Sequence, residues 1–228
     1  MQLLGYINQI ISKIIPQKVK VVVYLHRKTL KQLVMSLRGS ITTSDYLPFE
    51  EYQRLVNELE NDGQYMWAVY CLLSFCLALR VSDILKLRWK DIYEASSVKV
   101  TEKKTGKTKY VPIGNNTRER VTKLYGKMGK PSMNSFIIVN SHGGVISRQY
   151  INMIVKEWKK KYNLQIGNFS THTFRKTFGR YVYNKLGRTQ EALVCLNRIF
   201  RHASIQTTMI YIGLRDDEIG GIFNSIDI

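Results

Sequence analysis

Cysteine, proline and acidic residues are scarce in this sequence. Among its 228 residues are three cysteines and four prolines. Cys71, Cys76 and Cys195 are an odd number, and the first two lie in one apolar run, so neither a disulfide framework nor a zinc site with closely spaced ligands is expected. We therefore expect thiols that act as small core side chains, no bound metal, and a reducing, cytoplasmic setting.

Long hydrophobic runs are also missing. The most apolar stretch extends from Met66 to Leu79, whereas a membrane-spanning helix needs about 20 such residues. Because this stretch leads directly into Arg80, it predicts a buried core helix. The first residues, Met1-Gln2-Leu3-Leu4, lack the basic segment and the cleavage site of a secretory signal. Neither a membrane protein nor a secreted protein is expected.

Negative charge is outweighed by positive charge. Lys and Arg number 35, and Asp and Glu number 17, which gives a formal net charge of +18. An excess of this size favours a polyanionic partner, with nucleic acid first and an anionic membrane surface second. A solvated, lysine-rich face would give the same charge, so residue motifs have to distinguish these cases. The hydrophobic content of 44% is sufficient for a well-packed core.

The start of the chain is basic without any compensating negative charge, because no acidic residue precedes Asp45. This change in composition predicts a basic N-terminal arm or remnant appendage over residues 1–45 and a main domain over residues 46–228. The arm either contacts DNA or packs its apolar segment Val21–Tyr24 on the main domain. Its basic residues are Lys13, Lys18, Lys20, Arg27, Lys28, Lys31 and Arg38.

Hydrophobic periodicity in the main domain is mostly helical. The predicted elements are a helix after Pro48, the apolar helix 66–79, a short helix capped by Ser82, a hairpin of 97–103 and 109–113, a helix 117–127, a short strand 136–140, a helix capped by Ser147, and helices from Ser170 onward with breaks at Gly187, 201–204 and Gly213. The fold class is therefore mainly α with a small antiparallel β-sheet (α+β).

Metal-free cleavage of a DNA strand requires an oxygen nucleophile, positive donors around the phosphate oxygens and an acid for the leaving oxygen. Arg donates two hydrogen bonds to a phosphate from its planar fork, and Tyr is a stable covalent carrier. His172 and Arg175 lie three positions apart at the start of a predicted helix, so their side chains adjoin. Taken alone, such a pair is more typical of an ordinary helix surface than of a catalytic site.

Two further segments carry suitable side chains. Ser204 is expected to cap a helix that presents Tyr211 about two turns later, with His202 in the preceding turn. Taken alone, Tyr211 would also fit a core aromatic residue. Arg80 follows the apolar helix, where it either faces a cleft or pairs with Asp83.

The combination of these segments resembles the tyrosine recombinase or phage integrase family. The similarity covers about residues 46–212, which correspond to the catalytic domain of the family. It rests on four motifs, which are Ala78-Leu79-Arg80-Val81-Ser82-Asp83 and the residues up to Ile92, Lys104-Thr105-Gly106 with Val111-Pro112-Ile113, Thr171-His172-Thr173-Phe174-Arg175-Lys176, and His202-Ala203-Ser204 with Thr208 and Tyr211.

The resemblance implies a role for each matching residue. Tyr211 would be the nucleophile, Arg80 and Arg175 would grip the scissile phosphate, and His202 would donate to the same oxygens. Lys104 would protonate the leaving 5′ oxygen, although the adjacent Lys103 fits this role too. His172 would assist proton transfer at the Tyr211 hydroxyl, and Asp83 would support the site. Further DNA contacts are expected from Lys103, Lys107, Lys176 and Arg201.

Two positions depart from the usual motif of the family. Ala78 stands where glycine is usual, which keeps a small residue, and Phe200-Arg201 replaces Leu-Gly before His202, which we expect to alter that turn. Family members also carry a separate core-binding domain, for which residues 1–45 are too few.

The resemblance implies a site-specific recombinase that cuts and rejoins double-stranded DNA without a cofactor or metal. It also implies a homotetramer on DNA that exchanges C-terminal tails, here residues 216–228, whereas a tail that caps its own domain is the simpler alternative. Two other functions stay open. One is relaxation of DNA by a type IB topoisomerase, and the other is a non-enzymatic DNA-binding regulator that descends from a recombinase.

Overall fold

The protein is described from a computed structural model, and the structure describes residues 44–101, 106 and 108–214. The predicted N-terminal arm apart from its last two residues, the lysines 103, 104 and 107, and the predicted C-terminal tail lie outside these residues. The described residues belong to one compact unit that begins at Ser44. The predicted division at residues 45 and 46 stays a prediction.

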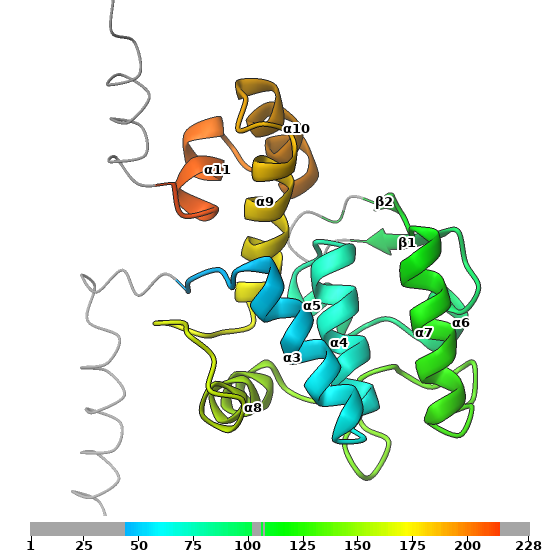
Figure 1. Cartoon of the computed structure of the whole chain (residues 1–228). Coiled ribbons are helices and arrows are strands. Elements are labelled where there is room, and N and C mark those ends of the chain that lie inside the picture. The colour runs from blue at the N-terminus through cyan, green and yellow to red at the C-terminus, as the bar shows by residue number, and fades with distance from the viewer. Residues whose placement is uncertain (1–43, 102–105, 107, 215–228) are drawn as a thin grey trace, which may run out of the picture. The chain divides into compact units, whose positions relative to one another are not determined.

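Helices make up most of the described structure (Figure 1). They are α3 (Phe49–Asn61), α4 (Tyr65–Cys76), α5 (Val81–Ile84), α6 (Trp89–Ile92), α7 (Asn115–Lys127), α8 (Arg148–Lys161), α9 (Thr173–Lys185), α10 (Gln190–Phe200) and α11 (Ile205–Tyr211). Strands β1 (Ser97–Thr101) and β2 (Thr108–Pro112) pair in antiparallel register, with Ser97 opposite Pro112. The predicted fold class is confirmed. No helix in the described ranges is long and apolar enough to cross a membrane.

Local signals explain where several helices begin. Ser147 and Ser204 cap α8 and α11, and each serine Oγ accepts a hydrogen bond from a backbone N–H three residues later, at 3.1 Å. Pro48 precedes α3, whose first turn carries Glu50 and Glu51, as the helix dipole favours.

Three local predictions are wrong in detail. The apolar helix α4 ends at Cys76 because Ala78 has a left-handed backbone with φ of 47°. Ser82 lies inside α5, whose N-cap is Arg80, since the carbonyl of Arg80 accepts the first helical hydrogen bonds. Residues 136–140 form isolated bridges at Phe136 and Val139 instead of a strand.

Of the three cysteines, only Cys71 is fully buried, whereas Cys195 is exposed.

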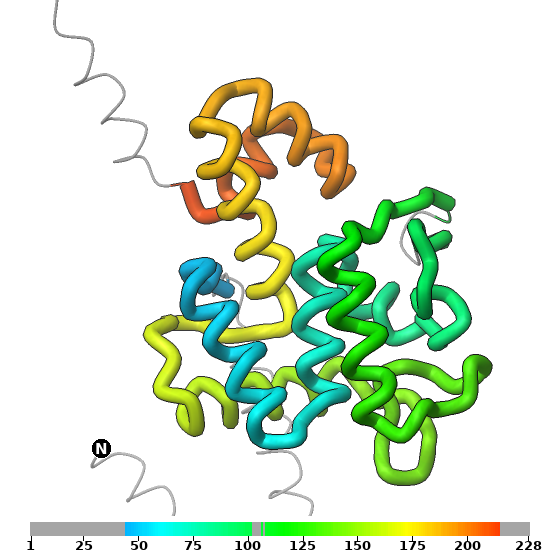
Figure 2. The backbone as a smooth tube through the Cα atoms, turned by 45° about the vertical axis from the view of Figure 1, so that its right-hand side comes forward, coloured from blue at the N-terminus to red at the C-terminus, as the bar shows by residue number. Residues whose placement is uncertain are grey.

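Two hydrophobic clusters organise the described residues. The larger one contains residues from α3 to α8 and the start of α9, and it includes Trp89 and Phe174. The smaller one joins the second half of α9 to α10 and to Ile212, and it includes Ala78 and Phe200. Helix α9 belongs to both clusters, and Figure 2 shows it, in yellow, running from the region of α3 and α4 toward α10 and α11. The start of α9 is thus anchored in the larger cluster and its second half in the smaller one.

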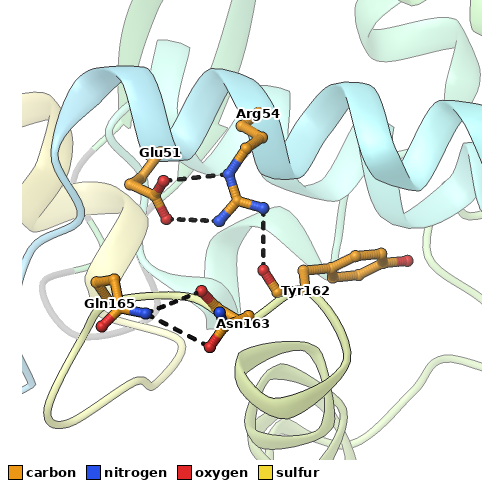
Figure 3. Close-up of polar contacts among 5 residues, drawn as sticks. All are labelled: Glu51, Arg54, Tyr162, Asn163 and Gln165. Carbon is orange, nitrogen blue, oxygen red and sulfur yellow. Dashed lines mark hydrogen bonds and ion pairs between the residues drawn. The ribbon is translucent and has the colours of Figure 1, made fainter.

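Polar contacts hold the segment that leads into α9. Arg54 of α3 forms two hydrogen bonds with Glu51, at 3.1 and 2.7 Å, and donates a third to the carbonyl of Tyr162 at 2.9 Å (Figure 3). Gln165 turns back onto Asn163 in the same loop. The Leu47 N–H donates to Thr177 Oγ1 in α9 at 2.9 Å. These contacts fix the path of the chain before His172.

Candidate active site

Arg175 is the most buried cation of the site, with 4% of its surface exposed. Its guanidinium donates to the carbonyl of Ala78 through Nη1, and to the carbonyl of Phe200 through Nη2 at 3.0 Å. It also lies over the Phe200 ring, 4.5 Å from the ring centroid. Since a buried charge requires hydrogen bonds, these carbonyls compensate for its burial and hold its orientation.

The two carbonyls come from unusual turns. Ala78 has φ of 47°, and Arg201, which follows Phe200, has φ of 53° and ψ of 51°. Both residues adopt the left-handed conformation that glycine accepts most readily. Arg201 thus has the backbone conformation that glycine adopts readily at the end of a helix, here α10, and the expected alteration of the turn before His202 stays a prediction. Its side chain is exposed.

Tyr211 is the last residue of α11 and faces Arg175. The Arg175 guanidinium carbon lies 6.0 Å from the centroid of its ring, and the His202 ring lies 4.9 Å away at an interplanar angle of 71°. The phenolic oxygen is buried beside Arg175. Burial raises the pKa of Tyr211, whereas the adjacent Arg175 guanidinium and the positive charge of Arg80 lower it.

His202 is held by a small polar network. Its Nδ1 lies 3.1 Å from Thr208 Oγ1, and Thr208 in turn accepts a hydrogen bond from Asn197 Nδ2 at 3.2 Å. Asn197 also donates to the carbonyl of His202 at 3.3 Å. One ring nitrogen is thus committed to the protein, which orients the imidazole beside Tyr211.

His172 is the N-cap residue of α9 and is exposed. Loss of hydration over part of its ring lowers the pKa of His172, and the positive charges of Arg175, Lys176, Arg148 and Arg80 lower it further. A neutral imidazole is therefore favoured at neutral pH, which suits a proton acceptor.

Five of the six residues predicted to be catalytic are thus neighbours, namely Arg80, His172, Arg175, His202 and Tyr211. Arg80 is half-buried at the start of α5, and its charge influences both His172 and Tyr211. The sixth residue, Lys104, lies outside the described residues, as do Lys103 and Lys107. Asp83 is buried in α5, with 3% of its surface exposed. The charges that most affect His172 and Tyr211 are all positive, which suits a phosphate.

Lys176, for which a DNA contact was predicted, is buried beside Tyr211. It is 6% exposed, and its ammonium lies 5.3 Å from the centroid of the Tyr211 ring. The predicted DNA contact stays a prediction. Asn197 and the carbonyls of residues 78 and 200 were not predicted to belong to the site, because backbone acceptors and supporting polar residues leave no motif. Thr208 was recognised only as part of the fourth motif, and its contact with His202 was not predicted.

Comparison with known proteins identifies the family. Residues 45–218 match the Phage integrase family. The probable integrase/recombinase YoeC of Bacillus subtilis is 33% identical over 168 residues, which are 74% of this chain and 86% of YoeC. Tyrosine recombinase XerD of Halalkalibacterium halodurans is 26% identical over 171 residues, which are 72% of this chain and 56% of XerD. The chain thus spans little more than half of XerD.

Solved structures share the fold. The crystal structure of XerA recombinase superposes with a TM-score of 0.62 at 20% identity and covers 90% of this chain, which matches 76% of XerA. The Tn1549 transposon integrase in complex with transposon right end DNA has a TM-score of 0.61 at 16% identity over 85% of this chain and 69% of the integrase. The chain belongs to the phage integrase family and has the catalytic-domain fold of the tyrosine recombinases, which are DNA strand breaking and rejoining enzymes. The predicted resemblance is confirmed.

Proposed function

We propose that this protein cuts and rejoins double-stranded DNA at specific sites through a covalent bond between Tyr211 and a 3′ phosphate. The observation that carries the proposal is the convergence of Tyr211, His202 and Arg175 with Arg80 and His172 in one cationic site. Their segments are far apart in the sequence, and membership of the phage integrase family supports the same function.

The proposed reaction exchanges one phosphodiester bond for another. The Tyr211 oxygen forms a bond to phosphorus while the bond to the 5′ oxygen breaks. The phenolic proton passes to His172, and the 5′ oxygen takes a proton from Lys104, or from Lys103 if that lysine is the acid. Arg80, Arg175 and His202 donate hydrogen bonds to the non-bridging oxygens as charge develops. The free 5′-hydroxyl of a partner strand then reverses the reaction, so no energy-supplying cofactor is needed.

The remaining contacts with DNA belong to the same proposal. Arg201 is exposed at the turn beside His202, and Arg148 lies close enough to His172 to lower its pKa. These observations support contacts of both residues with phosphates that flank the cleaved one. The predicted roles of Lys103 and Lys107 stay predictions, as does the cytoplasmic location.

We further propose a homotetramer on DNA that exchanges C-terminal tails. A groove of about 590 Å³ lies between the segment Tyr46–Glu50 and α9. A Cβ on Gly213 would lie 3.6 Å from the Tyr46 ring, so the chain leaves α11 next to this groove. The groove is thus suited to receive a tail from the same chain or from a neighbour. Gel filtration of the full chain and of a chain ending at Gly213, with folding checked by circular dichroism, distinguishes these cases.

The test of the reaction is covalent trapping. Wild-type protein and Tyr211→Phe are incubated with nicked suicide substrates taken from DNA that flanks the gene, and adducts are resolved on denaturing gels. We expect Tyr211→Phe to lose the adduct while DNA affinity is nearly unchanged. Tyr65→Phe, at the start of α4, is the control variant and should still form the adduct. An adduct that persists in Tyr211→Phe refutes the assignment, and relaxation of any supercoiled plasmid would favour a topoisomerase.

A further inference from the structure

Lys176 is a buried lysine for which the core gives no structural reason. Lysine is rarely buried without a charged partner, because removing an ammonium from water is unfavourable. Within the described ranges, the Lys176 ammonium makes neither a hydrogen bond nor an ion pair. Burial lowers the pKa of Lys176, and Asp45 partly opposes this effect. Asp45 itself accepts a hydrogen bond from the Asn168 N–H at 2.8 Å.

What Lys176 does contact is the ring of Tyr211. Its Nζ lies 5.3 Å from the ring centroid, within the range of a cation–π interaction. The same ring and the His202 ring form a T-shaped pair, with centroids 4.9 Å apart. The phenol thus contacts both a cation from α9 and an imidazole from the turn before α11.

We propose that Lys176 is a positioning residue for the nucleophile, which holds the Tyr211 ring beside His202 and stabilises the phenolate with its positive charge as the proton leaves. This inference rests on the proposed role of Tyr211. In this proposal Lys176 is buried because it acts on Tyr211, and it does not contribute to general DNA affinity.

Two other cations act on Tyr211, Arg175 from α9 and Arg80 from the start of α5, and the titratable His202 lies beside it in the turn before α11. The charges of Arg175 and Arg80 lower the pKa of Tyr211. The Lys176 ammonium, 5.3 Å from the ring centroid, is expected to add to this positive field. Removal of its charge therefore shifts the ionisation of Tyr211 to higher pH.

The experiment compares Lys176→Met, which keeps the length but removes the charge, with Lys176→Arg, which keeps the charge. Lys185→Met is the matched control, because Lys185 lies on the same helix with its Nζ 5.6 Å from the Tyr181 ring. The rate of adduct formation on suicide substrates is measured against pH. Nitration of Tyr211 by tetranitromethane, located by peptide mapping, is measured against pH without DNA.

We expect Lys176→Met to slow adduct formation roughly tenfold at neutral pH and to move both pH profiles upward by about one unit. Lys176→Arg and Lys185→Met should retain the wild-type profiles, and DNA affinity should not change. If Lys176→Met does not fold, Lys176→Gln takes its place. If the substrates give no adduct with wild-type protein, the pH profile of Tyr211 nitration alone tests whether Lys176 acts on Tyr211.

If Lys176→Met leaves both pH profiles unchanged while Tyr211→Phe loses the adduct, this inference is overturned and the proposed function is kept. An adduct that survives Tyr211→Phe overturns the proposed function instead. A fall in DNA affinity equal to the fall in rate would assign Lys176 to DNA binding and would also refute the positioning role.

Discussion

Single residues in this site have structural and chemical tasks at once. Arg175 donates to the carbonyls of Ala78 and Phe200, so the same guanidinium that is proposed to grip phosphate also connects two distant turns. A lysine cannot replace it, because one ammonium lacks the fixed fork of donors. The site therefore depends on an arginine for its geometry as well as for its charge.

Arg201 allows conformation and charge to be separated. The left-handed backbone at this position costs a residue other than glycine about 1–2 kcal/mol. Glycine avoids this cost, but its greater conformational entropy in the unfolded chain offsets part of the gain. We expect Arg201→Gly to be more stable than Arg201→Ala by about 1 kcal/mol in urea unfolding. Both variants should reduce the slope of log affinity against log salt by about one, if Arg201 contacts one phosphate. Equal stability of the two variants would contradict the strain at this turn.

At the scale of elements, α11 is short and carries the proposed nucleophile at its last position. Helices of this length are marginal by themselves, so the placement of Tyr211 depends on the cap and on packing against α9 and α10. Perturbation of either should affect cleavage more than binding.

The cap of α11 can be tested by Ser204→Ala. Loss of the hydrogen bond from Ser204 to the Thr207 N–H should cost about 1 kcal/mol and should increase amide exchange in α11. Cleavage should fall while DNA affinity is kept. Ser147→Ala removes the equivalent cap of α8 and is the control, with similar loss of stability but normal cleavage. Equal effects of the two changes on cleavage would argue against a special role of this cap.

The packing of α9 against its neighbours depends on Gly179. A Cβ at this position would lie 2.6 Å from Ile212 Cγ2 and 2.9 Å from Phe200 Cζ. Gly179→Ala should therefore destabilise the protein by roughly 1–3 kcal/mol and displace α11. Gly126→Ala in α7, where nothing lies within 4 Å of the added Cβ, should instead stabilise by up to about 1 kcal/mol. Thermal unfolding and adduct formation measure both effects.

At the scale of the whole molecule, the candidate site is a cluster of positive side chains in a chain whose formal net charge is +18. The cations that are proposed to bind phosphate also lower the pKa of His172, which favours a neutral imidazole. Under the proposed function, the charge of the protein would thus contribute both to DNA affinity and to proton transfer.

This coupling predicts a dependence on pH. Unfolded His172 takes up a proton near pH 6.5, whereas the folded residue does so at lower pH, since its pKa is lowered. Between these two values the unfolded state binds more protons, so stability falls as pH falls. Adduct formation should decrease in the same range, because protonated His172 cannot accept the phenolic proton.

Urea unfolding and cleavage between about pH 5 and about pH 8 check this expectation against the ordinary histidine pKa. His172→Asn should flatten the acid dependence of stability. The exposed His142→Asn, in the turn before α8, should leave both profiles as in the wild type. If the stability of His172→Asn still falls as the pH is lowered, another titrating group causes the effect.

The sequence by itself determined the fold class, the helix starts at Ser147 and Ser204, and the choice of candidate residues that the structure brings together. Those signals are local, since caps and hydrophobic periodicity depend on a few neighbours, and the candidate catalytic side chains lie in short motifs that resemble those of the family. Only the tertiary structure decided that Arg175 is held by two left-handed turns and that Lys176 is buried against Tyr211. These features arise where α9, α10 and α11 pack together, and no short segment encodes which helix face its neighbour will cover.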